Sequence, residues 1–244
     1  MKIVSTIEAR MTSSRLPGKP LFKANNITML EHLVNRLRSV HLIDEIVLAT
    51  TTNKEDDVLV KEAEILNISV FRGDEDNVMK RVIDAASSIN GDLIVEITGD
   101  CPIIDPNIIN ESINIFLSND YDYVGNALVR SYPDGMDTQV FKLDVLKKSY
   151  SMTNSKLDHE HVTLHIRNNP GLFNHFDLIA PDDLFWPDLG LTLDEEKDYT
   201  LIKKIIEHFG DKNNLFTCKE IIDYLKNNPA LLEINKSVKR KGNT

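Results

Sequence analysis

The sequence is poor in cysteine and in long apolar runs, and each shortage excludes a class of protein. Cys101 and Cys218 are the two cysteines in 244 residues, too few for a disulfide framework and without zinc-ligand spacing. No apolar run approaches the roughly 18 residues of a membrane-spanning helix, and no signal-peptide region precedes Glu8. A formal net charge of -10 opposes general nucleic-acid binding, which needs clustered Lys and Arg. We therefore expect a reduced, cytoplasmic globular protein that binds neither nucleic acid nor membrane.

The first half of the chain alternates between two patterns of apolar residues. Short apolar runs predict buried strands at 3–7, 46–49, 69–71 and 92–97. Helical spacing of apolar residues occupies the intervals at 29–37, 58–66, 78–86 and 106–116. Strands that alternate with helices predict an α/β fold with a parallel sheet covered on both faces. Ligands bind beyond the carboxyl ends of the strands in such sheets.

The second half departs from this alternation. Strands are expected at 121–124, 138–141 and 173–179, a helix at 158–168, a short strand at 191–193, and helices at 195–209 and 218–227. We expect one domain over residues 1–235, with a small mixed β extension at about 121–185. The basic residues 236–244 are expected to form a disordered tail.

The loop after the first strand is basic although the whole chain is acidic. Arg10, Arg15 and Lys19 lie within ten residues, together with Ser14 and a Pro-Gly turn that ends at Gly18. Arg donates two parallel hydrogen bonds to a phosphate, and Lys acts as a compact point charge. The loop has neither the P-loop pattern nor the Gly-x-Gly-x-x-Gly pattern. A solvated surface loop is the alternative, but the position after a buried strand favours a triphosphate site.

Two carboxylates follow predicted strands and are candidates for a metal site. Asp100 comes after the strand at 92–97, and Asp194 after the one at 191–193. Mg²⁺ binds one or two protein carboxylates together with substrate phosphates. Each Asp has a structural alternative: Asp100 can cap a turn, and Asp194 can be the N-cap of the helix that follows it.

Histidine and cysteine side chains are weaker candidates. His161 and His165 are spaced by four residues beside His159 and Glu160, but the full His-Glu-x-x-His motif is absent. This favours a substrate-binding or core role over zinc. Cys101 has no evident base to pair with, so we expect a small buried residue rather than a nucleophile.

Several motifs, taken together, resemble one family over nearly the whole chain. Residues 8–21 (EARMTSSRLPGKPL) closely resemble the nucleotide loop of the sugar-acid cytidylyltransferases, which include the CMP-Kdo and CMP-sialic acid synthetases. The remaining motifs are more similar to the SpsF-like branch, named for a spore-coat polysaccharide protein. They follow in the family's order as 71–81 (FRGDEDNVMKR), 98–102 (TGDCP), 132–137 (YPDGMD), 159–163 (HEHVT) and 191–194 (LTLD).

The resemblance implies a Rossmann-like three-layer nucleotidyltransferase fold that transfers CMP from CTP to a sugar with the help of Mg²⁺. It implies a homodimer, since family members commonly dimerise through the mixed extension. Asp100 and Asp194 would hold the metal, and Arg10, Lys19 and Asp100 would be catalytic. The nucleotide would be bound by Ala9, Arg10, Ser14, Arg15, Lys19, Arg72, Asp76 and Arg81. The acceptor pocket would comprise Arg130, Tyr132, Asp137, Gln139 and His161.

The sequence departs from the family pattern at three positions. Cys101 stands where the Kdo enzymes have an acidic residue, His159 where the SpsF-like pattern has Arg, and Gln139 where a carboxylate is common. These changes concern the acceptor more than the nucleotide chemistry. We expect an acidic 2-keto sugar as acceptor and a role in surface glycan synthesis.

Three other functions stay open at this point. An enzyme of the same fold could use GTP or another nucleotide with a sugar 1-phosphate. A non-catalytic nucleotide-binding subunit need not keep Arg10, Lys19, Asp100 and Asp194 together. A glycosyltransferase with a similar sheet usually has an Asp-x-Asp metal motif, whereas Gly99-Asp100-Cys101 offers one carboxylate.

Overall fold

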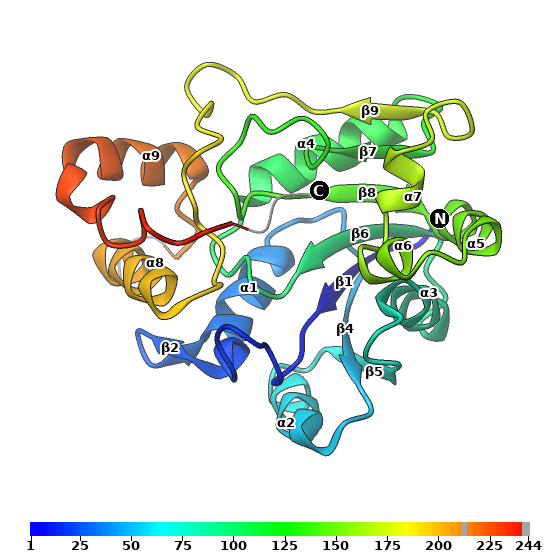
Figure 1. Cartoon of the computed structure of the whole chain (residues 1–244), viewed down its shortest axis with the longest axis horizontal. Helices are drawn as coiled ribbons and strands as arrows, with labels where there is room; N and C mark the ends of the chain where they lie inside the picture. The colour runs from blue at the N-terminus through cyan, green and yellow to red at the C-terminus, as the bar shows by residue number, and fades with distance from the viewer. Residues whose placement is uncertain (211–213, 241–244) are drawn as a thin grey trace.

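The computed structural model describes residues 1–210 and 214–240 of the chain. The described elements follow the alternation expected for the first half and depart from it in the second, where α5, α6 and α7 follow one another (Figure 1). In chain order they are β1 (Ile3–Glu8), η1 (Lys19–Leu21), β2 (Lys23–Ala24), β3 (Ile27–Thr28), α1 (Met29–Arg38), β4 (Glu45–Thr51), η2 (Lys54–Asp56), α2 (Asp57–Ile65), β5 (Ser69–Gly73), α3 (Val78–Ser88), β6 (Leu93–Thr98), α4 (Pro106–Leu117), β7 (Tyr123–Gly125), β8 (Gln139–Lys142), α5 (Leu143–Met152), α6 (Lys156–Glu160), α7 (Leu164–Arg167), β9 (His175–Asp177), α8 (Glu196–Phe209), α9 (Cys218–Asn227) and η3 (Pro229–Leu231).

The main sheet has the strand order β5-β4-β1-β6-β8-β7-β9. The four strands of the first half are mutually parallel, with β1 paired to both β4 and β6. Strand β8 is antiparallel to β6 and to β7, and β9 is parallel to β7. The mixed extension predicted from the sequence is therefore the continuation of the central sheet. The predicted α/β fold with a mostly parallel sheet is confirmed.

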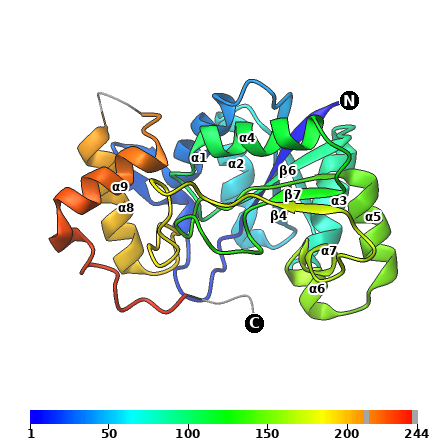
Figure 2. The same cartoon turned by 90° about the horizontal axis from the view of Figure 1, so that it is seen from above.

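Helices cover both faces of the sheet, as Figure 2 shows. On one face, buried side chains of α1, α2 and α4 pack against β1, β4 and β6. On the other face, α3, α5 and α7 pack against Val4 of β1 and Phe141 of β8. Both layers follow from helical spacing of apolar residues, since α1 buries Leu33 and Leu37 and α3 buries Val82 and Ala86.

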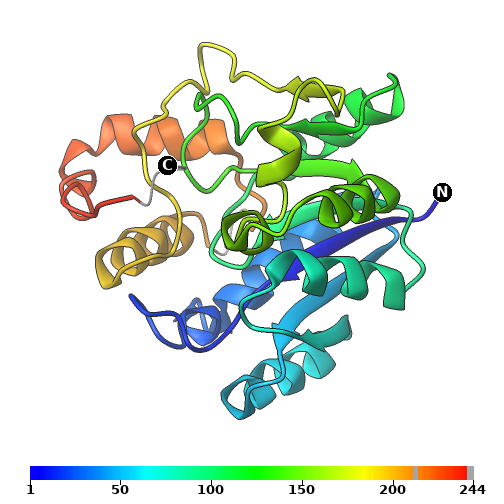
Figure 3. The same cartoon turned by 45° about the vertical axis from the view of Figure 1, so that its right-hand side comes forward.

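Helices α8 and α9 lie side by side at the end of the sheet towards which β1 and β6 point (Figure 3). Leu201 and Ile205 of α8 share one apolar cluster with Ile221 and Leu225 of α9. A capping box at Thr217 begins α9, and its bounds agree with the helix predicted at 218–227. These helices carry the chain back towards the carboxyl ends of the parallel strands.

Three local predictions were wrong or incomplete. The helix expected at 158–168 is divided into α6 and α7, because Val162 has a left-handed φ of 42°. The strand expected at 191–193 does not form: Leu191 N–H bonds Asp134 and Leu193 N–H bonds Asp100, so no neighbouring strand is paired continuously. Helix α5 was not expected, although it buries Leu143 and Leu146.

Part of the basic tail contacts the body of the protein. Residues 241–244 lie outside the described residues, while Arg240 forms an ion pair of 2.7 Å with buried Asp198 of α8. Over residues 1–210 and 214–240, the helices are all too short or too polar to cross a membrane.

Candidate active site

The carboxyl ends of β1 and β6 open into a cavity of about 440 Å³. The two strand ends approach closely, because Gly99 N–H donates to the Glu8 carbonyl at 2.9 Å. A Cβ at Gly99 would lie 2.8 Å from both the Glu8 carbonyl oxygen and the Ala9 Cβ, so this approach requires glycine. Most of the predicted site residues line the cavity: Ala9, Arg10, Ser14, Arg15, Lys19, Arg81, Asp100, Arg130, Tyr132, Asp137, Gln139, His161 and Asp194.

The basic loop leaves β1 and turns back at Gly18. Gly18 has a left-handed φ of 78°, which glycine adopts without strain. Its N–H bonds the Met11 carbonyl at 2.9 Å, and the Met11 N–H bonds a carboxylate oxygen of buried Asp56 at 2.6 Å. The loop is therefore fixed at both ends, and η1 starts directly after it with Lys19.

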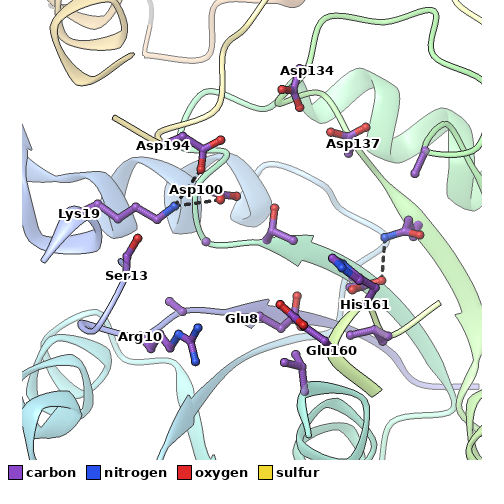
Figure 4. A pocket seen from close by; sticks show the side chains of 18 of the residues that line it. Glu8, Arg10, Ser13, Lys19, Asp100, Asp134, Asp137, Glu160, His161 and Asp194 are labelled. Atoms are coloured by element: carbon purple, nitrogen blue, oxygen red, sulfur yellow. Dashed lines mark hydrogen bonds and ion pairs between the residues drawn. The ribbon is translucent and has the colours of Figure 1, made fainter. Parts of the chain in front are cut away.

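Lys19 lies between the two predicted metal carboxylates (Figure 4). Its Nζ is 2.9 Å from Asp100 Oδ2 and 3.6 Å from Asp194 Oδ1. Burial alone would raise the pKa of Asp100, but the charge and hydrogen bond of Lys19, helped by Thr98, hold this pKa below its ordinary value. Asp100 is therefore ionised at neutral pH.

The predicted N-cap role of Asp194 was wrong by one residue. Glu195 is the N-cap of α8 and forms a capping box with Asp198. The Asp194 side chain instead points into the cavity (Figure 4). Arg15 Nη2 is 2.7 Å from its Oδ1. The helix start thus positions a carboxylate for the site without using it as a cap.

Asp100 and Asp194 suit a hard divalent cation that also binds phosphate oxygens. They come from two different segments and share Lys19, so both are directed at one point. Within the described residues there is no group of three or more His, Cys, Asp or Glu side chains arranged to hold a metal. Two carboxylates without a third ligand fit Mg²⁺, which keeps waters and substrate oxygens as its other ligands.

Each cation of the basic loop is held by a carboxylate. Arg10 Nη1 donates to Glu75 Oε1 at 2.9 Å, and Thr12 donates to the same oxygen at 3.0 Å. Arg15 and Lys19 pair with Asp194 and Asp100 as described above. A triphosphate that enters the cavity would therefore exchange these partners for phosphate oxygens, which Arg and Lys bind strongly.

Arg72 and Asp76, both predicted to bind nucleotide, are placed differently from the others. Arg72 donates to the carbonyls of Thr51 and Asn53 and to Asp57, so it fastens β5 to the start of α2. Neither Arg72 nor Asp76 is among the described residues that line the cavity. Glu75, between them, is the residue of this segment that contacts the basic loop.

Three of the predicted acceptor residues, Arg130, Tyr132 and Asp137, belong to the β7–β8 connection, and they line the cavity together with Gln139 and His161. Asp137 is half-buried beside Asp134, and burial together with that neighbouring charge raises the pKa of Asp137 to about 6. Gln139 donates to Glu96 Oε2 at 2.9 Å and accepts a hydrogen bond from Tyr123. The buried Cys101 has a pKa raised by burial and by Asp100, which agrees with an unreactive thiol.

Several residues that line the cavity were not among the predicted site residues; the charged ones are Glu8, Glu96, Asp134, Glu160 and Arg167. A signal for two of them was available. Glu8 and Glu96 lie on the same face of neighbouring strands that were predicted correctly, just before the loop and before Asp100. Acidic residues inside buried strands are rare and need an explanation.

Comparison with known proteins agrees with this geometry. A family model described as "Cytidylyltransferase" matches residues 4–234. The uncharacterized protein MJ1063 of Methanocaldococcus jannaschii is 37% identical over 99% of this chain and 97% of its own length. The spore coat polysaccharide biosynthesis protein SpsF of Bacillus subtilis is 33% identical over 93% and 95% of the two chains.

Two solved structures extend the comparison to the fold. A cytidylyltransferase from Leptospira borgpetersenii superimposes with a TM-score of 0.91 and 31% identity over 98% of this chain and all of that one. The CMP:2-keto-3-deoxy-manno-octonic acid synthetase complexed with CTP gives a TM-score of 0.64 at 18% identity over 85% and 99% of the two chains, which shows a shared fold. By the extent of the family match and of the 37% identity, this chain belongs to the cytidylyltransferase family.

Proposed function

We propose that this chain transfers CMP from CTP to a sugar acceptor, with release of pyrophosphate, for the synthesis of a surface polysaccharide. The observation that carries the proposal is Lys19, which lies between the half-buried Asp100 and Asp194 at the end of the basic loop. This arrangement provides cations for a triphosphate and two carboxylates for a divalent cation at one point.

We further propose Mg²⁺ as the cofactor, bound by Asp100 and Asp194. When bound, it would neutralise charge on the phosphate oxygens. Arg10, Arg15 and Lys19 would bind the triphosphate and stabilise the negative charge that develops on the departing pyrophosphate. Little covalent chemistry is required of the protein in such a transfer, because positioning and charge stabilisation do most of the work.

The acceptor is proposed to enter from the side of the β7–β8 connection. Asp137, whose pKa is raised to about 6, is a carboxylate at neutral pH and is suited to accept the proton of the attacking hydroxyl. Arg130 lines the same part of the cavity and can bind a carboxylate of the acceptor. These two side chains and the motif resemblance favour an acidic 2-keto sugar. The expected homodimer and cytoplasmic location stay predictions.

A thermal-shift comparison of CTP, GTP, ATP and UTP with Mg²⁺ tests the nucleotide. A ligand at a hundred times its dissociation constant stabilises the fold by about 2.7 kcal/mol. Selective stabilisation by CTP is expected. Preference for another nucleotide would indicate a sugar-1-phosphate enzyme, and no shift with any of the four would indicate a non-catalytic protein.

Substitution tests the assigned residues. Asp100→Asn is expected to lower pyrophosphate release at least about hundredfold, as for loss of one charge-stabilising group. Lys61→Ala, on the exposed side of α2, is the matched control and is expected to keep wild-type turnover. Near-normal turnover of Asp100→Asn in Mg²⁺ would refute the metal assignment.

A further inference from the structure

The carboxyl group of Glu8 is the feature of the cavity that the proposed transfer leaves unexplained. Both of its oxygens are buried, and among the described residues neither has a hydrogen-bond partner of normal geometry. The side chain nevertheless lines the cavity and is seen between Arg10 and Glu160 in Figure 4. A buried polar group without a partner is costly to the fold, so its retention favours a bound ligand that supplies the partner.

The surroundings of Glu8 define the chemistry of that ligand. Glu96 of β6 lies on the same face of the sheet and is itself buried, while the charge of Arg81 acts on Glu8 and that of Arg167 acts on Glu96. Burial, and then the charge of Glu96, raise the pKa of Glu8, and the Thr6 hydroxyl offsets a part of this. Carboxyl groups with raised pKa values give a phosphate or carboxylate no strong electrostatic attraction, whereas sugar hydroxyls can both donate hydrogen bonds to them and accept hydrogen bonds from them.

The position of Glu8 in the fold indicates which group of the substrate would contact it. The Glu8 carbonyl accepts the N–H of Gly99, the residue before Asp100, so the backbone of Glu8 lies beside the segment that carries the proposed metal carboxylate. Arg10, two residues further on, begins the triphosphate loop. The ribose of a nucleotide is bonded directly to the α-phosphate, so its hydroxyls would lie near a phosphate held at Asp100, as would those of the acceptor sugar.

We propose that Glu8 binds the neighbouring 2′- and 3′-hydroxyls of the nucleotide ribose and thereby selects ribonucleotides over deoxyribonucleotides. The two hydroxyls of a cis-diol supply both donors and acceptors, so they satisfy this carboxyl group whether or not it carries a proton. The inference rests on the proposed use of CTP. A hydroxyl pair on the acceptor sugar has the same chemistry, and the experiment below separates the two sources.

The first measurement needs no substitution. The dissociation constants of CTP, 2′-deoxy-CTP and 3′-deoxy-CTP are measured by calorimetry on the wild-type protein in Mg²⁺. CTP is expected to bind about tenfold more tightly than at least one deoxy analogue, a difference of about 1.4 kcal/mol. Equal affinities for all three nucleotides would refute the inference while leaving the proposed function intact. Failure of CTP itself to bind would refute both.

The second measurement assigns the discrimination to Glu8. Glu8→Ala is expected to raise the dissociation constant of CTP about tenfold and to leave that of the weaker-binding deoxy analogue unchanged. Glu8→Gln, whose amide still donates and accepts, is expected to restore part of the preference. Glu64→Gln, on the exposed face of α2, is the matched control and should bind like the wild type.

The unfolding free energy separates a ligand-binding role from a structural one. Because Glu8 has no protein partner of normal geometry among the described residues, Glu8→Ala is expected to unfold at no lower urea concentration than the wild type. A Glu8→Ala protein with unchanged CTP affinity and a higher KM for the acceptor would place the hydroxyl pair on the acceptor and overturn the ribose assignment. A lower unfolding midpoint with unchanged discrimination would make Glu8 a structural residue.

Discussion

Arg240 is expected to hold the C-terminal segment against the active site, and its removal should be measurable in stability. Its Nη2 lies 2.7 Å from Asp198 Oδ1, and its Nη1 donates to the Thr192 hydroxyl at 2.9 Å. The same guanidinium is 3.9 Å from Asp194 Oδ2 and 3.8 Å from Asp134 Oδ2. Arg240 thus joins the tail to the fully buried Asp198 and to a carboxylate of the proposed metal site.

The expected loss of unfolding free energy depends on the hydrogen bonds that Asp198 retains without Arg240. Loss of one partner from a buried ion pair typically costs about 3–5 kcal/mol, because the remaining charge is left uncompensated. After Arg240→Met, Asp198 would still accept hydrogen bonds from Asn235 at 2.9 Å and from the Glu195 amide at 2.9 Å. Since these neutral donors retain part of the stabilisation, we expect a loss of about 2 kcal/mol in the free energy of unfolding.

The assay is urea unfolding followed by far-ultraviolet circular dichroism. Lys236→Met is the matched control, because the Lys236–Glu233 pair lies on the surface and such pairs contribute about 0–1 kcal/mol. Gly190→Ala offers an independent perturbation: a methyl group there would overlap the guanidinium of Arg240 and displace it.

The double variant tests whether the two changes lower stability through the same contacts of Arg240. If both single changes act through the same guanidinium contacts, Gly190→Ala with Arg240→Met should cost hardly more than either change alone. Fully additive losses, or a loss below about 0.5 kcal/mol for Arg240→Met, would show that the tail does not stabilise the fold through Asp198.

Two further predictions concern buried titratable groups. Burial raises the pKa of Glu96 to about 8, partly offset by Arg167, so as pH rises from about 4.5 to about 8 the unfolded chain loses this proton before the folded protein does. Glu96 therefore lowers the free energy of unfolding as pH rises, by up to about 1.4 kcal/mol per unit of pKa difference. In urea unfolding, the stability of Glu96→Gln relative to the wild type should increase between pH 5 and pH 8. A constant difference across that range would contradict the prediction. Burial raises the pKa of Cys101 and Cys218, so iodoacetamide at pH 7.5 should label neither thiol until the protein is unfolded, as mass spectrometry can measure; rapid labelling of folded Cys101 would show that it is accessible.

Local pattern was sufficient for the elements that bury one continuous apolar face. The helices α8 and α9 were predicted to within one residue, because each repeats apolar residues at helical spacing and α9 begins with a capping box. The pattern failed where long-range bonds decide. Leu191 and Leu193 look like a strand in isolation, but their N–H groups bond two different segments, which the local sequence does not encode.

In the candidate site, too, some features could be predicted from the sequence and others depend on long-range contacts. Topology brought Lys19 and Asp100 together, since the parallel strands β1 and β6 end at one edge and the segments after them meet there. Asp194 follows no strand and is held beside them by the hydrogen bond from the Leu193 N–H to the Asp100 carbonyl. Charge and motif do not reveal the direction of a side chain: the guanidinium of Arg72 turns towards the carbonyls of Thr51 and Asn53, and its nucleotide-binding role stays a prediction.

Glu8 was not predicted as a site residue although it begins the motif at residues 8–21, because at that position it reads as the end of a strand. Its carboxyl oxygens become significant once the fold shows that they are buried in the cavity wall. An acidic residue in a buried strand beside a phosphate loop is a sequence signal that can be sought in other chains of this fold. The physical basis of this signal is that a buried carboxyl group without a partner lowers the stability of the free protein, and a substrate hydroxyl that binds it removes this cost.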